Sequence, residues 1–214
     1  MPGSISAEKL QYKPPPPAPP PADGGDWGER PSGAHRRASL TGIYVLLSAI
    51  TMFFAALTSS LVVRRGLGDD WSGVPVPGIL WWNSAGIVLS SIALEVARRA
   101  LARGARQAFN LWWTAGTALG ALFLAGQYLA WTQMSAAGIY VRTTPGSSFF
   151  YLFTVAHAVH VLGGVAALLY IEIQALRLRL GPGKRTAVEV SRLYWHFLAG
   201  LWIYLMILFN LWGK

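Results

Sequence analysis

The chain has 214 residues, of which 53% are hydrophobic and only 13% are charged, whereas an ordinary soluble domain carries about 25% charged residues. Charged residues are missing from five windows, each long enough for a transmembrane helix of about 20 mainly apolar residues. This pattern excludes a soluble globular enzyme and predicts a polytopic membrane protein. The five windows are residues 38–63, 71–94, 107–141, 143–171 and 193–213.

The absence of cysteine and the net charge of +9 limit the chemistry and the partners of this chain. Without cysteine there are no disulfides, no thiolate metal ligands and no cysteine nucleophiles. Basic residues of a membrane protein concentrate in its cytoplasmic loops, so we interpret the positive charge as a signal of topology. We therefore expect a membrane environment and no nucleic-acid partner.

The chain divides into a tail and one membrane domain. Residues 1–39 are rich in proline and polar side chains, and we expect this cytoplasmic tail to be disordered. Residues 40–214 form the membrane domain, in which Arg64 and Arg65 end the first helix and the segment 181–183, Gly-Pro-Gly, separates the last two. The predicted fold class is an all-α bundle of five transmembrane helices, at about residues 40–63, 78–97, 109–135, 147–175 and 191–212.

The distribution of Lys and Arg predicts the orientation of the bundle. Most of the 18 basic residues lie in the tail, between the second and third helices, and between the fourth and fifth helices. With five helices these three regions share one side of the membrane. The positive-inside rule then places the N-terminus in the cytoplasm and the C-terminus outside.

Few ionisable side chains lie at membrane depth. Glu95, Glu172 and Glu189 all lie at the predicted cytoplasmic end beside arginines, where we expect local ion pairs. No carboxylate lies near the centre of a predicted helix. This disfavours a proton pump, because a proton relay needs ionisable groups within the bilayer.

The histidines are the polar residues that most need an explanation. His157 and His160 share one helical face near mid-membrane, and His196 opens the fifth helix. A metal site in a bundle needs ligands that converge from facing helices, typically with carboxylates, and two axial haem ligands must lie on opposite sides of the iron. We favour neutral histidines that form hydrogen bonds to neighbouring helices or to a partner. Gly116 and Gly120 form a GxxxG pair that allows close helix packing.

Several motifs in the second half of the chain resemble those of a known family. The fifth helix contains Tyr194-Trp195-His196-Phe197, with Glu189 ahead of it, and the fourth contains a Gly-Ser-Ser-Phe-Phe segment at 146–150 followed by His157 and His160. These segments resemble the signatures of subunit III of the haem-copper oxidases, in the same order and spacing. Further likenesses, over about residues 40–213, are Gln127, the Met-Phe-Phe run at 52–54 and, weakly, Asn83-Ser84 and Ser90-Ser91. The predicted arrangement of five helices resembles the short bacterial form of this family.

The resemblance implies a subunit without a catalytic centre of its own, in a respiratory terminal oxidase of the bacterial inner membrane. It implies that haem and copper reside in subunit I, and that this chain packs against and stabilises subunit I, contacts other oxidase subunits and holds phospholipid. No catalytic, cofactor-binding or metal-binding residue is assigned in this chain. The candidates for the lipid cleft or the subunit interface are Gln127, His157, His160, Glu189, Arg192, Trp195 and His196.

The sequence also departs from the pattern of the family. Ile50, Ala130 and Ala199 stand where the family commonly has acidic residues. The resemblance therefore implies no role in proton supply for these three residues. Three alternatives stay open on the sequence: an accessory subunit of a nitric oxide reductase or a quinol oxidase, a stand-alone membrane haem protein, and a small transporter.

Overall fold

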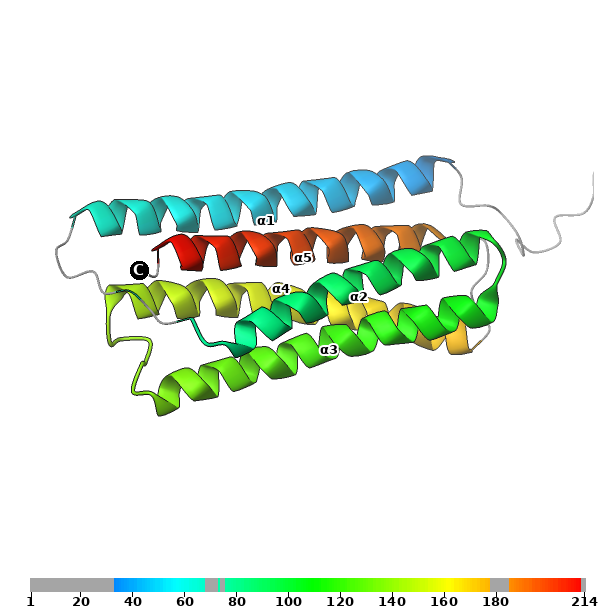
Figure 1. Ribbon diagram of the computed structural model, residues 1–214. Coiled ribbons are helices and arrows are strands. Elements are labelled where there is room, and N and C mark those ends of the chain that lie inside the picture. Colours follow the sequence, from blue (N-terminus) through cyan, green and yellow to red (C-terminus); the bar gives the residue numbers. More distant parts are fainter. Residues whose placement is uncertain (1–32, 68–72, 74–75, 178–184, 213–214) are drawn as a thin grey trace, which may run out of the picture.

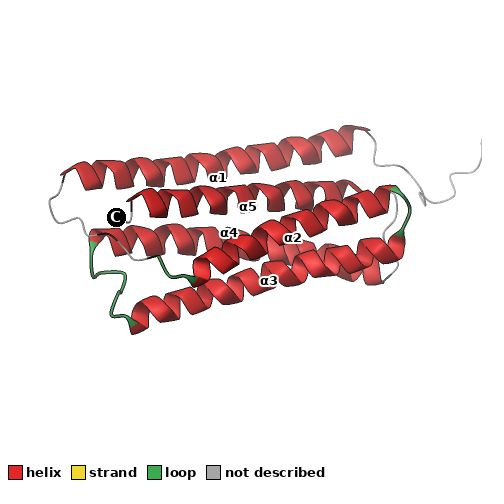
Figure 2. Ribbon diagram, in the orientation of Figure 1, coloured by secondary structure: helices red, strands yellow, loops and turns green. Residues whose placement is uncertain are grey.

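The computed structural model of the chain describes residues 33–67, 73, 76–177 and 185–212. Over these residues it contains helices and no strand, as Figure 2 shows. The result confirms the predicted all-α fold with five helices. The helices are α1 (Gly33–Leu67), α2 (Ile79–Ala102), α3 (Arg106–Ala136), α4 (Pro145–Leu176) and α5 (Arg185–Trp212).

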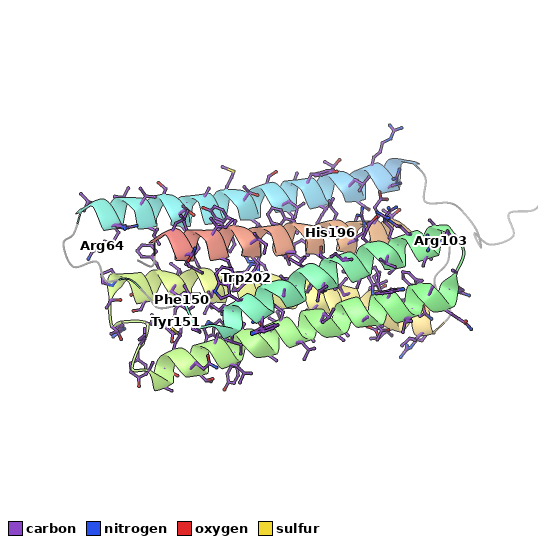
Figure 3. The ribbon with its side chains drawn as sticks, in the orientation of Figure 1. Arg64, Arg103, Phe150, Tyr151, His196 and Trp202 are labelled. Atoms are coloured by element: carbon purple, nitrogen blue, oxygen red, sulfur yellow. The ribbon has the colours of Figure 1, made fainter. Side chains whose placement is uncertain are left out.

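All five helices are long and apolar enough to cross a membrane. They run antiparallel to their neighbours in the sequence, so that α1 begins and α5 ends at opposite ends of the bundle (Figure 1). We call the end where α1, α3 and α5 begin the charged end, because it holds the ion pairs of Arg36, Glu95, Glu189 and Arg192. Figure 3 labels Arg103 at the charged end and Arg64 at the opposite end.

The helices extend beyond the predicted apolar spans, mainly at the charged end. The first helix begins at Gly33 and not near residue 40, so residues 33–39 are helical, whereas residues 1–32 of the predicted tail lie outside the described residues. Similarly, α2 continues to Ala102 and α5 starts at Arg185. Apolar runs mark only the part of a helix that lies in hydrocarbon, whereas the hydrogen-bonded backbone continues into the polar interface.

The helices α2 and α3 form a hairpin with close backbone contact. Their connection turns at Gly104, which has a positive φ of 76° that glycine adopts without strain. Ser90 donates a hydrogen bond to the Gly116 carbonyl at 2.7 Å, and Asn83 donates one to the Phe123 carbonyl at 3.2 Å. Gly116 lies against Leu94 and the Ser90 carbonyl, and Gly126 lies against the Asn83 side chain. The lack of a side chain at these two glycines lets the helices approach closely enough for the two bonds.

The helix α5 lies at the centre of the bundle. Half of its apolar window is buried, compared with 22% for α1. The indole of Trp195 is fully buried and packs against Gly120 of α3 and Gly164 of α4. Further along α5, the Nε1 group of Trp202 donates a hydrogen bond to Ser84 Oγ of α2 at 2.9 Å. These two tryptophans therefore connect α5 to α2, α3 and α4.

The helix α1 lies on one side of the bundle and contacts only α4 and α5 among the described helices (Figure 1). Its buried residue Phe54 packs against Phe153 of α4, with ring centroids 6.2 Å apart. A hydrogen bond of 2.8 Å joins the hydroxyls of Thr58 and Tyr204. The remaining surface of α1 is strongly apolar, and its exposed large side chains are Tyr44, Val45, Leu46, Met52, Phe53, Val62, Val63 and Leu67.

The glycine contacts of Trp195 give a first test. A methyl group on Gly120 would lie 2.5 Å from Cη2 of Trp195, whereas one on Gly163 would meet nothing within 4 Å. We expect Gly120→Ala to lower the free energy of unfolding by about 1–3 kcal/mol, because the buried indole has no space to move into. Gly163→Ala should change it by less than about 1 kcal/mol. Unfolding of the full chain by dodecyl sulfate in mild detergent measures both, and equal effects would contradict this packing.

Candidate functional site

The predicted site residues lie at two depths in the bundle. Gln127, His157 and His160 lie on the central parts of α3 and α4. The other four, all on the first turns of α5, lie at or near the charged end and are Glu189, Arg192, Trp195 and His196. Figure 3 shows His196 closer to the charged end and Trp202 further along the same helix. The structure therefore gives two clusters, which we describe in turn.

Gln127 and His157 lie inside the bundle, with exposed fractions of 1% and 0%. The amide of Gln127 and both ring nitrogens of His157 have no hydrogen-bond partner among the described residues. The imidazole of His157 lies between aromatic rings, 5.9 Å from Phe123 and 5.1 Å from Trp202 by ring centroids. Their closest surroundings are the side chains of this chain, so in this bundle they act in internal packing.

His160 links α4 to two of its neighbours, α1 and α5. Its Nδ1 group donates a hydrogen bond to the Ala156 carbonyl of its own helix at 2.7 Å, which fixes the orientation of the ring. The ring packs 5.9 Å from Phe54 of α1, and the Tyr194 hydroxyl of α5 donates to the His160 carbonyl at 3.2 Å. His160 thus lies where α1 rests on α4 and α5.

Trp195 and His196 are consecutive residues of the fifth-helix motif that face different neighbours. Trp195 is buried against the glycines of α3 and α4, and its Nε1 group has no partner among the described residues. A hydrogen bond joins His196 Nδ1 to Ser91 Oγ of α2. Both side chains are occupied by contacts within the bundle, which makes this motif a packing element of α5.

One carboxylate at the charged end binds three guanidinium groups. Glu95 lies 2.6 Å from Arg98, 3.1 Å from Arg99 and 2.9 Å from Arg192 by their closest N–O distances. The pairs with Arg98 and Arg99 are local to α2, as the sequence predicted. The pair with Arg192 joins α2 to α5 across 97 residues, and the sequence offered only a weak signal for it, namely that both residues lie at the same predicted depth.

The other two carboxylates also bind residues of neighbouring helices. Glu189 forms an ion pair of 3.1 Å with Arg36 of α1, in the segment that the sequence had assigned to the tail. Glu172 accepts a hydrogen bond of 2.8 Å from the Thr114 hydroxyl of α3. The charged end therefore ties α1 to α5, α2 to α5, and α3 to α4.

The described residues contain no group of three or more His, Cys, Asp or Glu side chains that could hold a metal ion. Ile50, Ala130 and Ala199, which replace the acidic residues of the resembled family, are all buried, with exposed fractions of 6% or less. The described interior of the bundle is therefore apolar at these three positions.

The two ion pairs of α5 should differ in their contribution to stability. Replacing Glu95 by Gln leaves the mostly buried Arg192 without its countercharge, and we expect a loss of about 1–3 kcal/mol of unfolding free energy. Glu189→Gln removes a largely solvent-exposed pair and should cost no more than about 1 kcal/mol. Thermal unfolding of the full chain in detergent compares them, and a larger loss for Glu189→Gln would contradict the assigned roles.

Known proteins resemble this chain over nearly the whole described bundle. The family profile described as "Cytochrome c oxidase subunit III" matches residues 39–214. The "Cytochrome c oxidase subunit 3" of Corynebacterium diphtheriae is 29% identical over 175 residues, which cover 78% of this chain and 84% of the relative. The "Probable cytochrome c oxidase subunit 3" of Nocardia farcinica is 29% identical over 173 residues, covering 76% and 82%.

A more distant relative gives the same result. The "Cytochrome c oxidase subunit 3" of Thermostichus vulcanus is 27% identical over 185 residues, covering 81% of this chain and 87% of the relative. The family match, over residues 39–214, reaches all five helices, including both motif-bearing helices α4 and α5. The chain therefore belongs to the cytochrome c oxidase subunit III family, as a multi-pass membrane subunit of a respiratory terminal oxidase.

Proposed function

We propose that this chain is a non-catalytic subunit that packs against the haem-copper catalytic subunit I in the bacterial inner membrane, stabilises it and holds phospholipid. The observation that carries this proposal is that the polar side chains of the family motifs contact other parts of this chain. Gln127 and His157 are buried within the bundle, and the ring of His160 packs against Phe54 of α1. His196 forms a hydrogen bond to Ser91 of α2. Electron transfer and oxygen reduction then belong to the haem and copper of subunit I.

The outer surface of the bundle supports a role in association with other subunits and with lipid. Large apolar side chains are exposed along α1 and on parts of α2, α3 and α4. In a membrane such a surface is covered either by acyl chains or by other helices. The helix α1 is held by few contacts to α4 and α5, and a neighbouring subunit would give it the packing that the bundle alone does not supply.

The proposed orientation places the charged end in the cytoplasm. The N-terminal segment up to Arg37 and the two connections at this end together carry most of the Lys and Arg residues of the chain, and the positive-inside rule assigns such segments to the cytoplasmic side. The loop between α3 and α4, with its single charged residue Arg142, then lies outside the cytoplasm.

The orientation can be tested directly because the chain contains no cysteine. Ala105 in the α2–α3 connection and Val141 in the α3–α4 connection are both exposed, at opposite ends of the bundle. We expect a membrane-impermeant maleimide to label Val141→Cys in intact spheroplasts, and to label Ala105→Cys only after the membrane is opened. The reverse pattern would contradict the proposed topology.

The proposed partner can be tested by isolation of the complex. A tagged full-length chain, purified from its native membrane in mild detergent, should carry along a subunit with haem and copper, identified by mass spectrometry and by its optical spectrum. After dissociation in a harsher detergent, the tagged chain should show no Soret absorption of its own.

A matched control is a tagged membrane protein of the same cells that is unrelated to respiration, which should bring down no haem. A Soret band stoichiometric with the dissociated chain would contradict the non-catalytic role. Failure to recover any haem-copper subunit with the tagged chain would contradict the proposed partner.

A further inference from the structure

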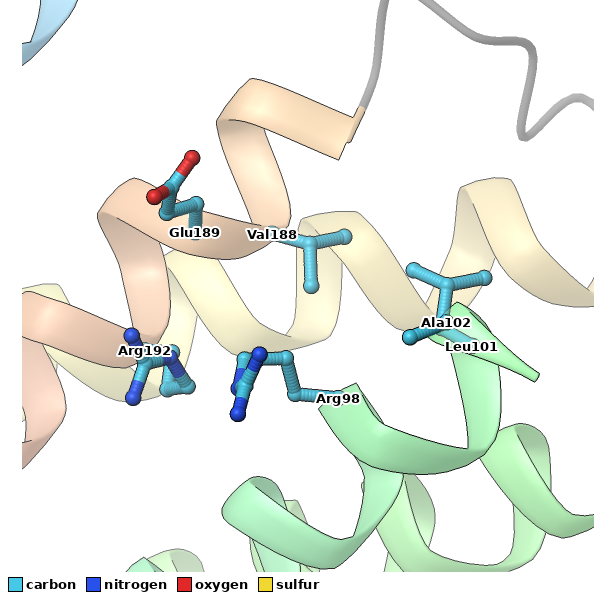
Figure 4. Close-up of a pocket in the computed structure, with 6 residues that line it drawn as sticks. All are labelled: Arg98, Leu101, Ala102, Val188, Glu189 and Arg192. Carbon is cyan, nitrogen blue, oxygen red and sulfur yellow. The ribbon is translucent and has the colours of Figure 1, made fainter.

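Two groups of polar side chains in the bundle differ in their partners. At the charged end, between α2 and α5, polar residues line a pocket of about 210 Å³ (Figure 4). The charged side chains of this pocket, Arg98, Glu189 and Arg192, each belong to an ion pair. In the interior, by contrast, the polar atoms of Gln127 and His157 have no hydrogen-bond partner among the described residues. The interior pair is therefore the one whose chemistry the contacts within the chain do not complete.

The spacing along α3 and α4 places Gln127 and His157 at the same depth. Gly120 of α3 and Gly164 of α4 both contact the indole of Trp195. Gln127 follows Gly120 by seven residues, and His157 precedes Gly164 by seven. Seven residues make about two turns of an α-helix. Because α3 and α4 are antiparallel, both side chains lie two turns from the Trp195 contact, in the same direction and on the same faces as the two glycines.

Two further contacts between α3 and α4 support this register. The Nε1 group of Trp131 donates a hydrogen bond to Thr154 Oγ1 at 3.1 Å. From that bond, Gln127 is four residues back along α3 and His157 is three residues on along α4. The ring of Phe123, one turn from Gln127, packs 5.9 Å from the imidazole of His157 by ring centroids. The two unpaired side chains therefore belong to one layer of the interior.

The other polar side chains near this layer already form hydrogen bonds. The Nε1 group of Trp202, whose ring stacks on the imidazole of His157, donates to Ser84 Oγ at 2.9 Å. Asn83 donates to the Phe123 carbonyl, and Thr154 donates to a carbonyl of its own helix. These bonds leave Gln127 and His157 as the residues of the layer whose hydrogen-bonding groups are unused.

The unused capacity is large for so enclosed a place. A glutamine amide has two N–H donors and a carbonyl acceptor, and a neutral imidazole has one donor and one acceptor. With exposed fractions of 1% and 0%, neither side chain reaches lipid head groups, bulk water or another subunit. A direct bond between them would leave most of these groups unpaired, which is strongly unfavourable in a protein interior. A buried water molecule donates and accepts at once, and it typically makes about three hydrogen bonds.

We propose that the layer between Gln127 and His157 is a binding site for one internal water molecule. The water accepts a hydrogen bond from the amide nitrogen of Gln127 and donates one to the unprotonated ring nitrogen of His157. It thereby joins α3 to α4 in the central part of the bundle. The site concerns the interior of this chain, and it is independent of the proposed partner.

A density map of the natural full chain, at a resolution that shows ordered water, tests the site directly. We expect one water molecule within hydrogen-bond distance, about 2.7–3.2 Å, of both the Gln127 amide and a ring nitrogen of His157. A map that shows the amide bonded directly to the imidazole, or no ordered density between them, would overturn the proposal. This measurement needs no variant, so it stands even if the variants below fail to fold.

A double-mutant cycle measures whether the two side chains share the bound water. Gln127→Met keeps the length of the side chain without its polar groups, and His157→Phe keeps a ring against Trp202. Each single change leaves the polar groups of the other residue unpaired, and it should raise the equilibrium constant of unfolding about tenfold. In the double variant no polar group of the pair remains, and the constant should stay within about threefold of that of the natural chain. Unfolding of the full chain by dodecyl sulfate in mild detergent gives these constants.

The matched control is Thr117→Val, also on α3. Thr117 is buried as well, but its hydroxyl donates to the Trp113 carbonyl of its own helix at 3.0 Å. Its effect should therefore add to that of His157→Phe in a combined variant. If the effects of Gln127→Met and His157→Phe also add, the two side chains do not share a ligand and the proposal is wrong.

Discussion

The indole of Trp195 packs against Gly120 of α3 and Gly164 of α4, and this contact sets how close α5 lies to both helices. Side chains cannot gain from the hydrophobic effect by leaving lipid for another helix, so close packing at small residues carries much of the association energy in membranes. Because α5 lies at the centre, the other contacts follow from its position. Trp202 reaches Ser84 of α2, and Tyr194 reaches the His160 carbonyl of α4.

This central packing explains why the conspicuous polar residues of the chain carry no redox chemistry of their own in our proposal. His157 lies against Phe123 and Trp202, His160 against Phe54, and His196 is bonded to Ser91. The three imidazoles point to three different environments. A bundle of this kind offers a rigid apolar body with charged groups gathered at its ends, which suits a subunit that supports a neighbour in the membrane.

The charged end joins neighbouring helices through ion pairs. Glu95 joins α2 to α5 and at the same time holds Arg98 and Arg192 in fixed positions. An ion pair at the edge of hydrocarbon keeps its geometry better than one in bulk water, because fewer water molecules compete for its hydrogen bonds.

The sequence by itself determined the number of helices, their approximate spans and the gathering of charge at alternate connections, because an apolar run and a cluster of arginines are local properties of the chain. It also identified the motif residues through their spacing. Only the tertiary structure decided that Gly116 faces Leu94 while Gly120 faces Trp195, and that Glu189 pairs with Arg36 and Glu95 with Arg192. The partners of these pairs are 153 and 97 residues apart, and their meeting depends on the rotation and depth at which each helix packs, which periodicity does not specify.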